Sequence, residues 1–234
     1  LGALQVDHVQ PMRHLHTMRL MLRVYQQTQN HAKVLELARA LRRKDAISQA
    51  KANNLIESAA ASMIRAAQTQ KPATPDHKQD NKQDGKRDGK QDTHPTATPS
   101  WEACWKELKS EEKVLPEVAL AGAQAFQAAG NYKEATKVLE AAITSTRDKT
   151  KSDIKLAPLD SKLLAAYARA EPEQVTPRLQ KAEQWLEERK ALQKKQGNHE
   201  NAASNAALLT TLGALCLAAQ MWGQAQRYLE QSAK

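Results

Sequence analysis

The stretch Ala206–Ala233 reads AALLTTLGALCLAAQMWGQAQRYLEQSA, and it decides the fold. Leucines in its first half recur at intervals of three and four residues, which places them on one face of a helix. A corner lies near Met221, and Ala225, Tyr228 and Leu229 form a second apolar face after it. The stretch therefore predicts two short helices that pack antiparallel.

Small residues stand where these two helices would meet. Gly213 follows Leu212 in the first helix, and a bulky side chain at that position would push the second helix away. The order Leu212-Gly213, Trp222, Ala225 resembles a tetratricopeptide repeat, whose period is about 34 residues. An ordinary helical hairpin of a bundle would show the same apolar faces, and this alternative stays open.

A second copy of the pattern spans Pro116–Ile143, with Gly130 at the turn. The residues that correspond are Phe126 with Cys216, Tyr132 with Trp222, Ala135 with Ala225, and Leu139 with Leu229. A weaker copy spans Met18–Leu41, with Tyr25 in the Phe126 position. A further hairpin spans Asp160–Leu192 and is anchored by Tyr167 and Trp185, although its corner departs from the repeat pattern. The residues expected to pack the repeats together are Tyr25, Phe126, Gly130, Tyr132, Ala135, Trp185, Leu212, Gly213, Trp222 and Ala225.

The fold class that follows is all-α, with antiparallel hairpins stacked as a tetratricopeptide-like α-solenoid. No run of β-branched and aromatic residues bounded by turns predicts a strand. Residues 1–68 hold the first hairpin and a long helix that begins near Asp45, residues 69–100 an insertion, and residues 101–234 the other hairpins, in one solenoid with 1–68. Two small helical domains joined by a tether are the alternative.

The segment 69–100 differs in composition from the rest of the chain. It has no Leu, Ile, Val, Met or aromatic residue, so it cannot bury enough apolar surface to offset the entropy of ordering, and we expect disorder. Aspartates recur every four residues with lysines between them, while Gly85 and Gly89 oppose a helix. A calcium loop is a poor match, because lysines occupy alternate positions and the final glutamate is missing.

Trp101 and Trp105 begin the next helix and are four residues apart, so both rings lie on one face, and we expect them to pack against a neighbouring helix. Cys104 and Cys216 fall on apolar faces and are expected to be buried free thiols. Thr144–Ile154 reads as a polar connection.

The formal net charge is +9, of which residues 1–68 carry +6. Such a basic end suits an acidic protein, anionic lipid or nucleic acid, and solubility alone explains it equally well. Phosphate-binding glycine loops, dinucleotide fingerprints, nucleophile elbows and metal-ligand spacings are missing from the sequence, so we expect no enzyme, no cofactor and no metal site. No run of about 18 apolar residues predicts a membrane span.

Repeat scaffolds of this kind bind partners in the groove lined by the first helix of each hairpin. Mapping the groove positions gives His16, Arg19, Arg23, Gln26 and Gln27 from the first hairpin. The other expected groove residues are Glu117, Gln124, Gln127, Thr210, Ala214 and Leu217. The first set is basic and suits an acidic segment.

The order of these features resembles the HemY-type tetratricopeptide proteins of the bacterial inner membrane, which are associated with haem biosynthesis. The matching segments are Met18–Lys44, Trp101–Leu108 (WEACWKEL), Val118–Ile143, Ala182–Lys190 (AEQWLEERK) and Leu208–Ala233. The last segment, with L-G-x-L-C and W-G-x-A-x-x-Y-L-E, is the most specific, and the insertion 69–100 departs from the family pattern.

The resemblance implies a non-catalytic scaffold that organises enzymes of late haem biosynthesis on the cytoplasmic side of the inner membrane. The membrane anchor would be N-terminal and absent from this chain, whose opening LGALQV reads as the tail of a preceding helix in a fragment. No nucleic acid is expected as a partner. The alternative is a haem- or porphyrin-binding carrier domain, with His16 and Arg23 as first candidates for ligand and propionate contacts.

Overall fold

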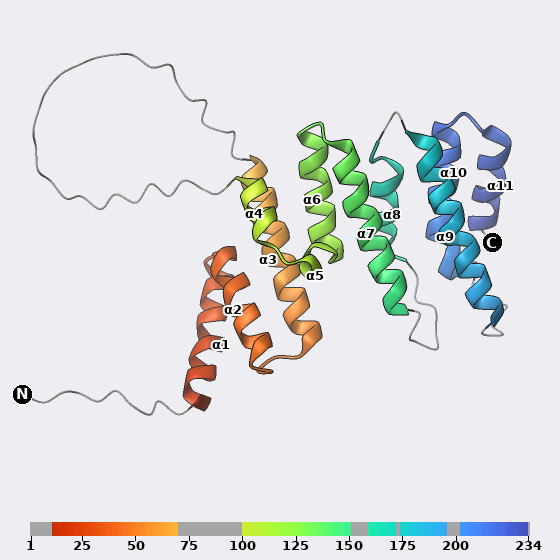
Figure 1. Ribbon diagram of the computed structural model, residues 1–234. Helices are drawn as coiled ribbons and strands as arrows, with labels where there is room; N and C mark the ends of the chain where they lie inside the picture. The colour runs from red at the N-terminus through yellow and green to blue at the C-terminus, as the bar shows by residue number, and fades with distance from the viewer. Residues whose placement is uncertain (1–10, 70–99, 151–158, 172–173, 196–201, 234) are drawn as a thin grey trace, which may run out of the picture.

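The computed structural model describes residues 11–69, 100–150, 159–171, 174–195 and 202–233, and every regular element in these ranges is a helix (Figure 1). The expectations for residues 1–10, for the insertion as far as residue 99, and for the connections 151–158 and 196–201 lie outside them. The helices are α1 Pro11–Gln27, α2 His31–Arg43, α3 Gln49–Thr69, α4 Trp101–Glu107, α5 Ser110–Lys113, α6 Pro116–Ala128, α7 Tyr132–Thr150, α8 Ser161–Ala168, α9 Val175–Lys195, α10 Ala202–Ala218 and α11 Trp222–Ser232. The all-α prediction is confirmed.

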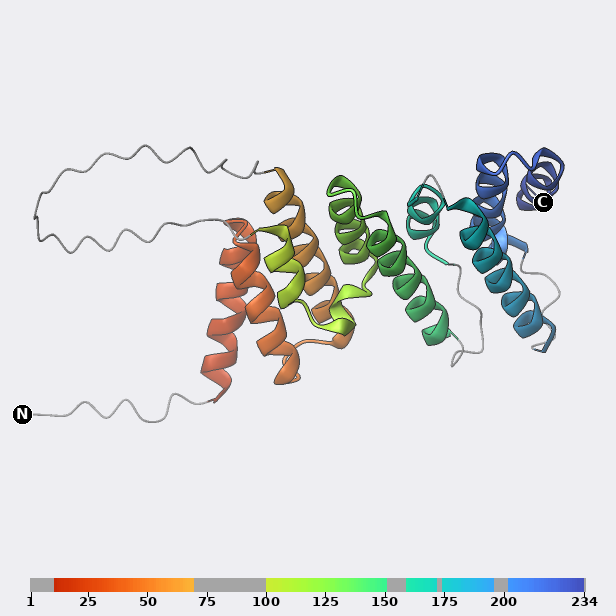
Figure 2. The same cartoon turned by 45° about the horizontal axis from the view of Figure 1, so that its top comes forward.

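The helices form an elongated row that runs from α1 at one end to α11 at the other (Figures 1 and 2). Consecutive helices pack as hairpins in α1–α2, α6–α7 and α10–α11. Helix α3 packs against α2, against α4 and against α6, while α10 contacts both α8 and α9. Segments on the two sides of residues 70–99 therefore lie side by side.

Three hairpins share one turn. The turns 28–30, 129–131 and 219–221 have the same length, and their central residues Gln29, Gly130 and Gln220 have φ of 55°, 76° and 60°. In each turn the third residue donates its N–H to a carbonyl five residues back, on Tyr25, Phe126 and Cys216 respectively. Tyr25, Phe126 and Cys216, which the sequence pattern aligns with one another, thus accept the same hydrogen bond in the three turns.

Two apolar cores meet at α6. Val118, Ala121 and Ala125 belong to a core with α1, α2, α3 and α4. Ala119 and Ala123, on the opposite side of the same helix, belong to a core with α7 to α11. Because small residues cover both faces, neighbouring helices approach α6 closely from two sides.

Two helical glycines mark the closest approaches. A Cβ at Gly122 would lie 2.3 Å from Cζ3 of Trp105, and a Cβ at Gly213 would lie 2.6 Å from Cδ2 of Leu229. The close approach expected at Gly213 is therefore present. The edges of Trp101 and Trp105 meet Phe126 at centroid distances of 5.0 and 5.7 Å, so the tryptophan pair packs on a neighbouring helix as expected.

Most of the expected packing residues lie in these cores. Ala135, Trp185, Leu212 and Ala225 are buried, and Tyr25 and Phe126 pack against the cores while partly exposed. Tyr167 and Trp185 join α8 to α9 with ring centroids 5.2 Å apart. Both cysteines are buried free thiols, as predicted.

Tyr132 and Trp222 correct the prediction, because they are 42% and 67% exposed rather than packed between helices. Each is the first residue of its helix, three residues before the fully buried Ala135 or Ala225. The alanines let the paired backbones come so close that no room remains between them for an aromatic ring, which turns outward.

Two smaller expectations also change. The long helix begins at Gln49 rather than near Asp45: Asp45 has φ of 49° in the preceding turn, and the hydroxyl of Ser48 accepts the N–H of Lys51 at 3.4 Å. The polar stretch after Thr144 continues α7 to Thr150 rather than forming a connection. Helical propensity over one more turn outweighs the polarity of that stretch.

Candidate functional site

A groove of about 810 Å³ opens between α3, α6 and α8, and its wall also includes the first residue of α7. Its lining residues are Arg65, Glu117, Leu120, Gln124, Gln127, Ala128, Tyr132, Lys162, Ala165, Ala166 and Arg169. Three of its four helices are separated in the sequence by long intervals. The groove therefore exists only because α3 and α8 both lie beside α6.

The charge of this groove is positive. Glu117 is the one carboxylate among the lining residues, whereas Arg65, Lys162 and Arg169 are cations. It accepts hydrogen bonds from Arg65 at 2.9 Å and from Lys162 at 3.1 Å. These two bonds hold the pKa of Glu117 below its ordinary value, so the carboxylate is ionised at neutral pH. Arg169 is exposed and makes no side-chain hydrogen bond or ion pair with the described residues.

Two amides and a set of apolar surfaces complete the groove. Gln124 is exposed, whereas the side chain of Gln127 donates to the carbonyl of Ala170 at 3.3 Å and joins α6 to the end of α8. Tyr132 presents its exposed ring beside the helix end at Ala128. The amides can hydrogen-bond a peptide backbone, the aromatic ring can pack on apolar side chains, and the cations can pair with acidic ones, so the surface suits a peptide.

The structure brings together only part of the expected groove. Gln124, Gln127 and Glu117, which the sequence assigns to a partner groove, line this hollow. His16, Arg19, Arg23, Gln26 and Gln27 do not: all are exposed on α1, which packs against α2 and is absent from the groove wall. Arg19 is also engaged locally, since it donates to the carbonyl of Ala46 at 2.5 Å.

The three cations of the groove, Arg65, Lys162 and Arg169, are not among the binding residues expected from the sequence. Lys162 and the C-cap residue Arg169 are seven residues apart, which is two helical turns, so the spacing does indicate that they share one side. The irregular corner after Arg169 departs from the repeat pattern and hides this correspondence. Arg65 carries no such signal, because its place depends on the packing of α3 against α6.

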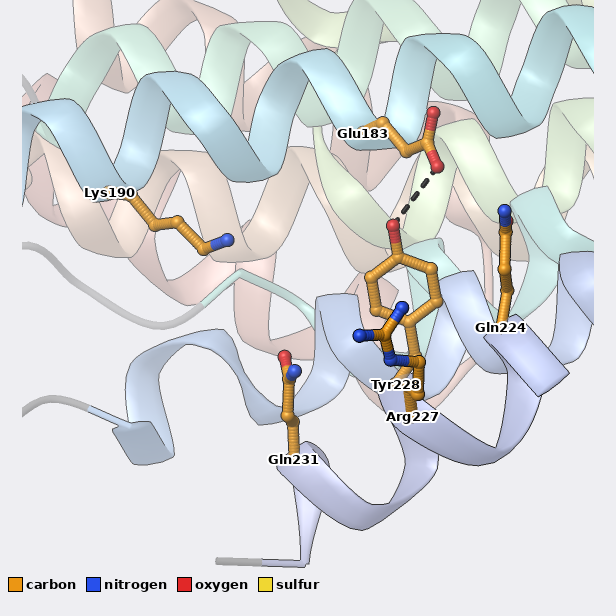
Figure 3. Close-up of a pocket in the computed structure, with 6 residues that line it drawn as sticks. All are labelled: Glu183, Lys190, Gln224, Arg227, Tyr228 and Gln231. Atoms are coloured by element: carbon orange, nitrogen blue, oxygen red, sulfur yellow. Dashed lines mark hydrogen bonds between the residues drawn. The ribbon is translucent and has the colours of Figure 1, made fainter.

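A second, smaller hollow of about 270 Å³ lies between α9 and α11 (Figure 3). Figure 3 shows the hydroxyl of Tyr228 pointing across it to Glu183, to which it donates at 3.0 Å. Burial and the neighbouring carboxylate raise the pKa of Tyr228 to about 12, so the hydroxyl keeps its proton. Lys190 on its rim pairs with Glu187 at 3.0 Å, and Arg227 is exposed.

Neither hollow is lined by a histidine or a cysteine. Within the described ranges no cluster of three or more His, Cys, Asp or Glu residues could hold a metal ion. Burial raises the pKa of both Cys104 and Cys216, so neither is an activated thiol. Among the same residues, no helix is both long and apolar enough to cross a bilayer.

No protein-family model, curated protein or solved structure matches this chain.

Proposed function

We propose that this chain is a tetratricopeptide-like α-solenoid that binds a partner protein in the groove between α3, α6 and α8. The observation that carries the proposal is the groove itself, which is open and is lined by side chains from three helices that are far apart in the sequence, α3, α6 and α8. The repeated turns at Gln29, Gly130 and Gln220 support the solenoid, because equal turns give these three hairpins the same local geometry.

The partner class that we propose is the enzymes of late haem biosynthesis, with the intact protein at the bacterial inner membrane. This part rests on the HemY-type resemblance of segments such as Leu208–Ala233. The haem-carrier alternative has less support, because His16 and Arg23 are exposed on α1 and line neither of the hollows described above.

Site-specific photocrosslinking tests the binding role. A photoreactive amino acid is placed at Gln124 in the groove or, as a control, at Gln226, which is exposed on α11 and pairs with Glu230. We expect one discrete adduct in a bacterial membrane lysate from position 124 and none from position 226. Mass spectrometry of that adduct identifies the partner.

Two results count against the proposal. Equal crosslinking at both positions would show that the groove has no special role. If the crosslinked partner is not an enzyme of haem biosynthesis, the scaffold proposal stands and the assignment to that pathway is wrong. The double variant Arg19→Glu/Arg23→Glu should leave the adduct in place, because both residues lie on α1, outside the groove.

A further inference from the structure

The geometry points to an acidic partner: we propose that the groove receives an extended segment whose carboxylates meet Arg65, Lys162 and Arg169. This inference rests on the proposed function and adds the chemistry of the ligand. Three cations against one carboxylate leave the groove wall positively charged. Complementary charge favours an acidic segment and disfavours a basic one.

Glu117 shows how a carboxylate fits this site. Its oxygens lie between a cation from α3 and a cation from α8, at 2.9 and 3.1 Å. The side chains of Arg65, Glu117 and Lys162 are all at least 38% exposed, so a ligand can reach them from the groove. Glu117 thus occupies the position of a ligand carboxylate, and an acidic partner competes with it for the two cations.

Arg169 supplies a second point of contact. It is the C-cap residue directly after α8, seven residues after Lys162, and both side chains line the same groove. Seven residues of helical rise correspond to about 10 Å. A polyproline II chain rises about 3.1 Å per residue and completes one turn in three residues, so it covers that distance in about three residues with both side chains on one face. The groove therefore selects acidic side chains three residues apart, and the exposed ring of Tyr132 offers apolar surface to the residues between them.

Fluorescence anisotropy with matched peptides tests this inference on the whole chain. The probes are fluorescein-labelled ESTESTE, QSTQSTQ and KSTKSTK, which differ only in charge. We expect ESTESTE to bind more tightly than both others, and its affinity to fall as salt is raised, because exposed charges are screened.

Three variants locate the binding site. Arg169→Glu should weaken ESTESTE binding about tenfold, since one attractive contact becomes repulsive. Arg227→Glu is the matched control, an exposed arginine on α11 that lies outside this groove, and it should change the affinity less than twofold. Glu117→Gln should tighten binding about threefold, because Arg65 and Lys162 lose their internal partner.

The outcomes separate the inference from the function on which it rests. If QSTQSTQ or KSTKSTK binds as well as ESTESTE and Arg169→Glu has no effect, the acidic preference is wrong while a peptide groove survives. If Arg227→Glu weakens binding as much as Arg169→Glu, the acidic segment binds elsewhere and the inference falls. If no peptide binds and the crosslink at position 124 is also absent, the proposed function falls as well.

Discussion

At the scale of single residues, this fold depends on glycines at close helix contacts and on a buried carboxylate that is paired with an arginine. Gly122 and Gly213 leave room for Trp105 and Leu229, which would otherwise collide with a Cβ. Glu112 is almost fully buried and is held by Arg39 and by the N–H of Lys109. Each of these positions joins elements from different parts of the chain.

Gly122→Ala should lower the free energy of unfolding by about 1–2 kcal/mol. The new methyl group would lie 2.3 Å from the Trp105 ring, which Phe126 holds in place, and overpacking of this size outweighs the better helix propensity of alanine. Chemical denaturation measures the loss. The control is Gly223→Ala, because a Cβ at Gly223 would have no atom within 4 Å beyond its chain neighbours and its own helix backbone. This variant should be neutral or slightly stabilising. Equal stability of the two variants would show that the contact is not limiting.

Glu112→Gln should lower the free energy of unfolding by about 2 kcal/mol at neutral pH, because the charge-assisted hydrogen bonds between Arg39 and the carboxylate are lost. Burial opposes ionisation of Glu112, but the bonds from Arg39 and Lys109 outweigh it, and its pKa lies below the ordinary 4.5. A carboxyl whose folded pKa is lowered stabilises the protein above its unfolded pKa and loses that contribution as pH falls through the folded value. Stability of the parent protein should therefore decline below about pH 4.5.

Unfolding curves at several pH values test this assignment. The variant should show a shallower acid decline than the parent, since the group responsible is gone. The neighbouring Glu111→Gln is the control: Glu111 pairs with Arg42 at 3.1 Å but is largely exposed, so its loss should cost less than about 1 kcal/mol. If the stability of Glu112→Gln declines with acid as steeply as that of the parent protein, Glu112 is not the group responsible for the decline.

At the scale of elements, the ends of helices are satisfied by residues that lie elsewhere in the chain. The backbone N–H of Glu117 at the start of α6 donates to the carboxylate of Glu57 on α3, at 2.7 Å. The guanidinium of Arg178 on α9 caps the end of α8 by donating to the carbonyls of Tyr167 and Ala168, at 2.7 and 3.0 Å. These contacts fix how neighbouring helices meet.

The shared turn leads to a prediction at the same scale. Gln220 adopts φ of 60°, a left-handed conformation that costs a non-glycine residue about 1–2 kcal/mol. Gln220→Gly should therefore stabilise the protein by about 0.5–1 kcal/mol after the added freedom of the unfolded chain is counted. Thermal unfolding measures the gain.

The reciprocal change provides the control. Gly130→Gln should destabilise by a similar amount, because Gly130 has φ of 76° and no neighbouring atom would clash with a Cβ there. If both variants shift stability in the same direction, backbone conformation is not the cause.

At the scale of the whole molecule, α6 couples the two halves. Its two faces belong to the two cores, and Phe126 packs against one of them while it touches the tryptophans of the other. An elongated row has few other contacts between distant parts, so cooperativity has to pass through helices that are shared.

The chain should therefore unfold in one transition. Leu41→Ala lies in the first core and Leu212→Ala in the second, and each should lower the midpoint of that same transition by an amount equivalent to about 2–5 kcal/mol. Circular dichroism and tryptophan fluorescence should report coincident curves for the parent and both variants. Two separate transitions, each moved by only one variant, would favour two domains on a tether.

Local pattern was sufficient for most of the helices and for the alignment of the hairpins. Phe126 and Cys216 were placed in register from spacing alone, and the turn hydrogen bonds agree. The outward position of Trp222 was not predictable, because the spacing of apolar residues says which face is inside but not how close two backbones come. Gln124 and Gln127 lie on a hairpin with a regular repeat pattern, so the face of α6 that carries them is predictable from spacing.

The amino-acid sequence by itself determined the helical class, the hairpin turns and the buried faces, because these depend on residues within about one repeat of each other. Only the tertiary structure decided that α3 and α8 flank α6, and hence that Arg65, Lys162 and Arg169 share one groove with Glu117. The reason is physical: charges on exposed helix faces carry no periodic signal of their own, and their neighbours are chosen by the packing of the apolar faces behind them.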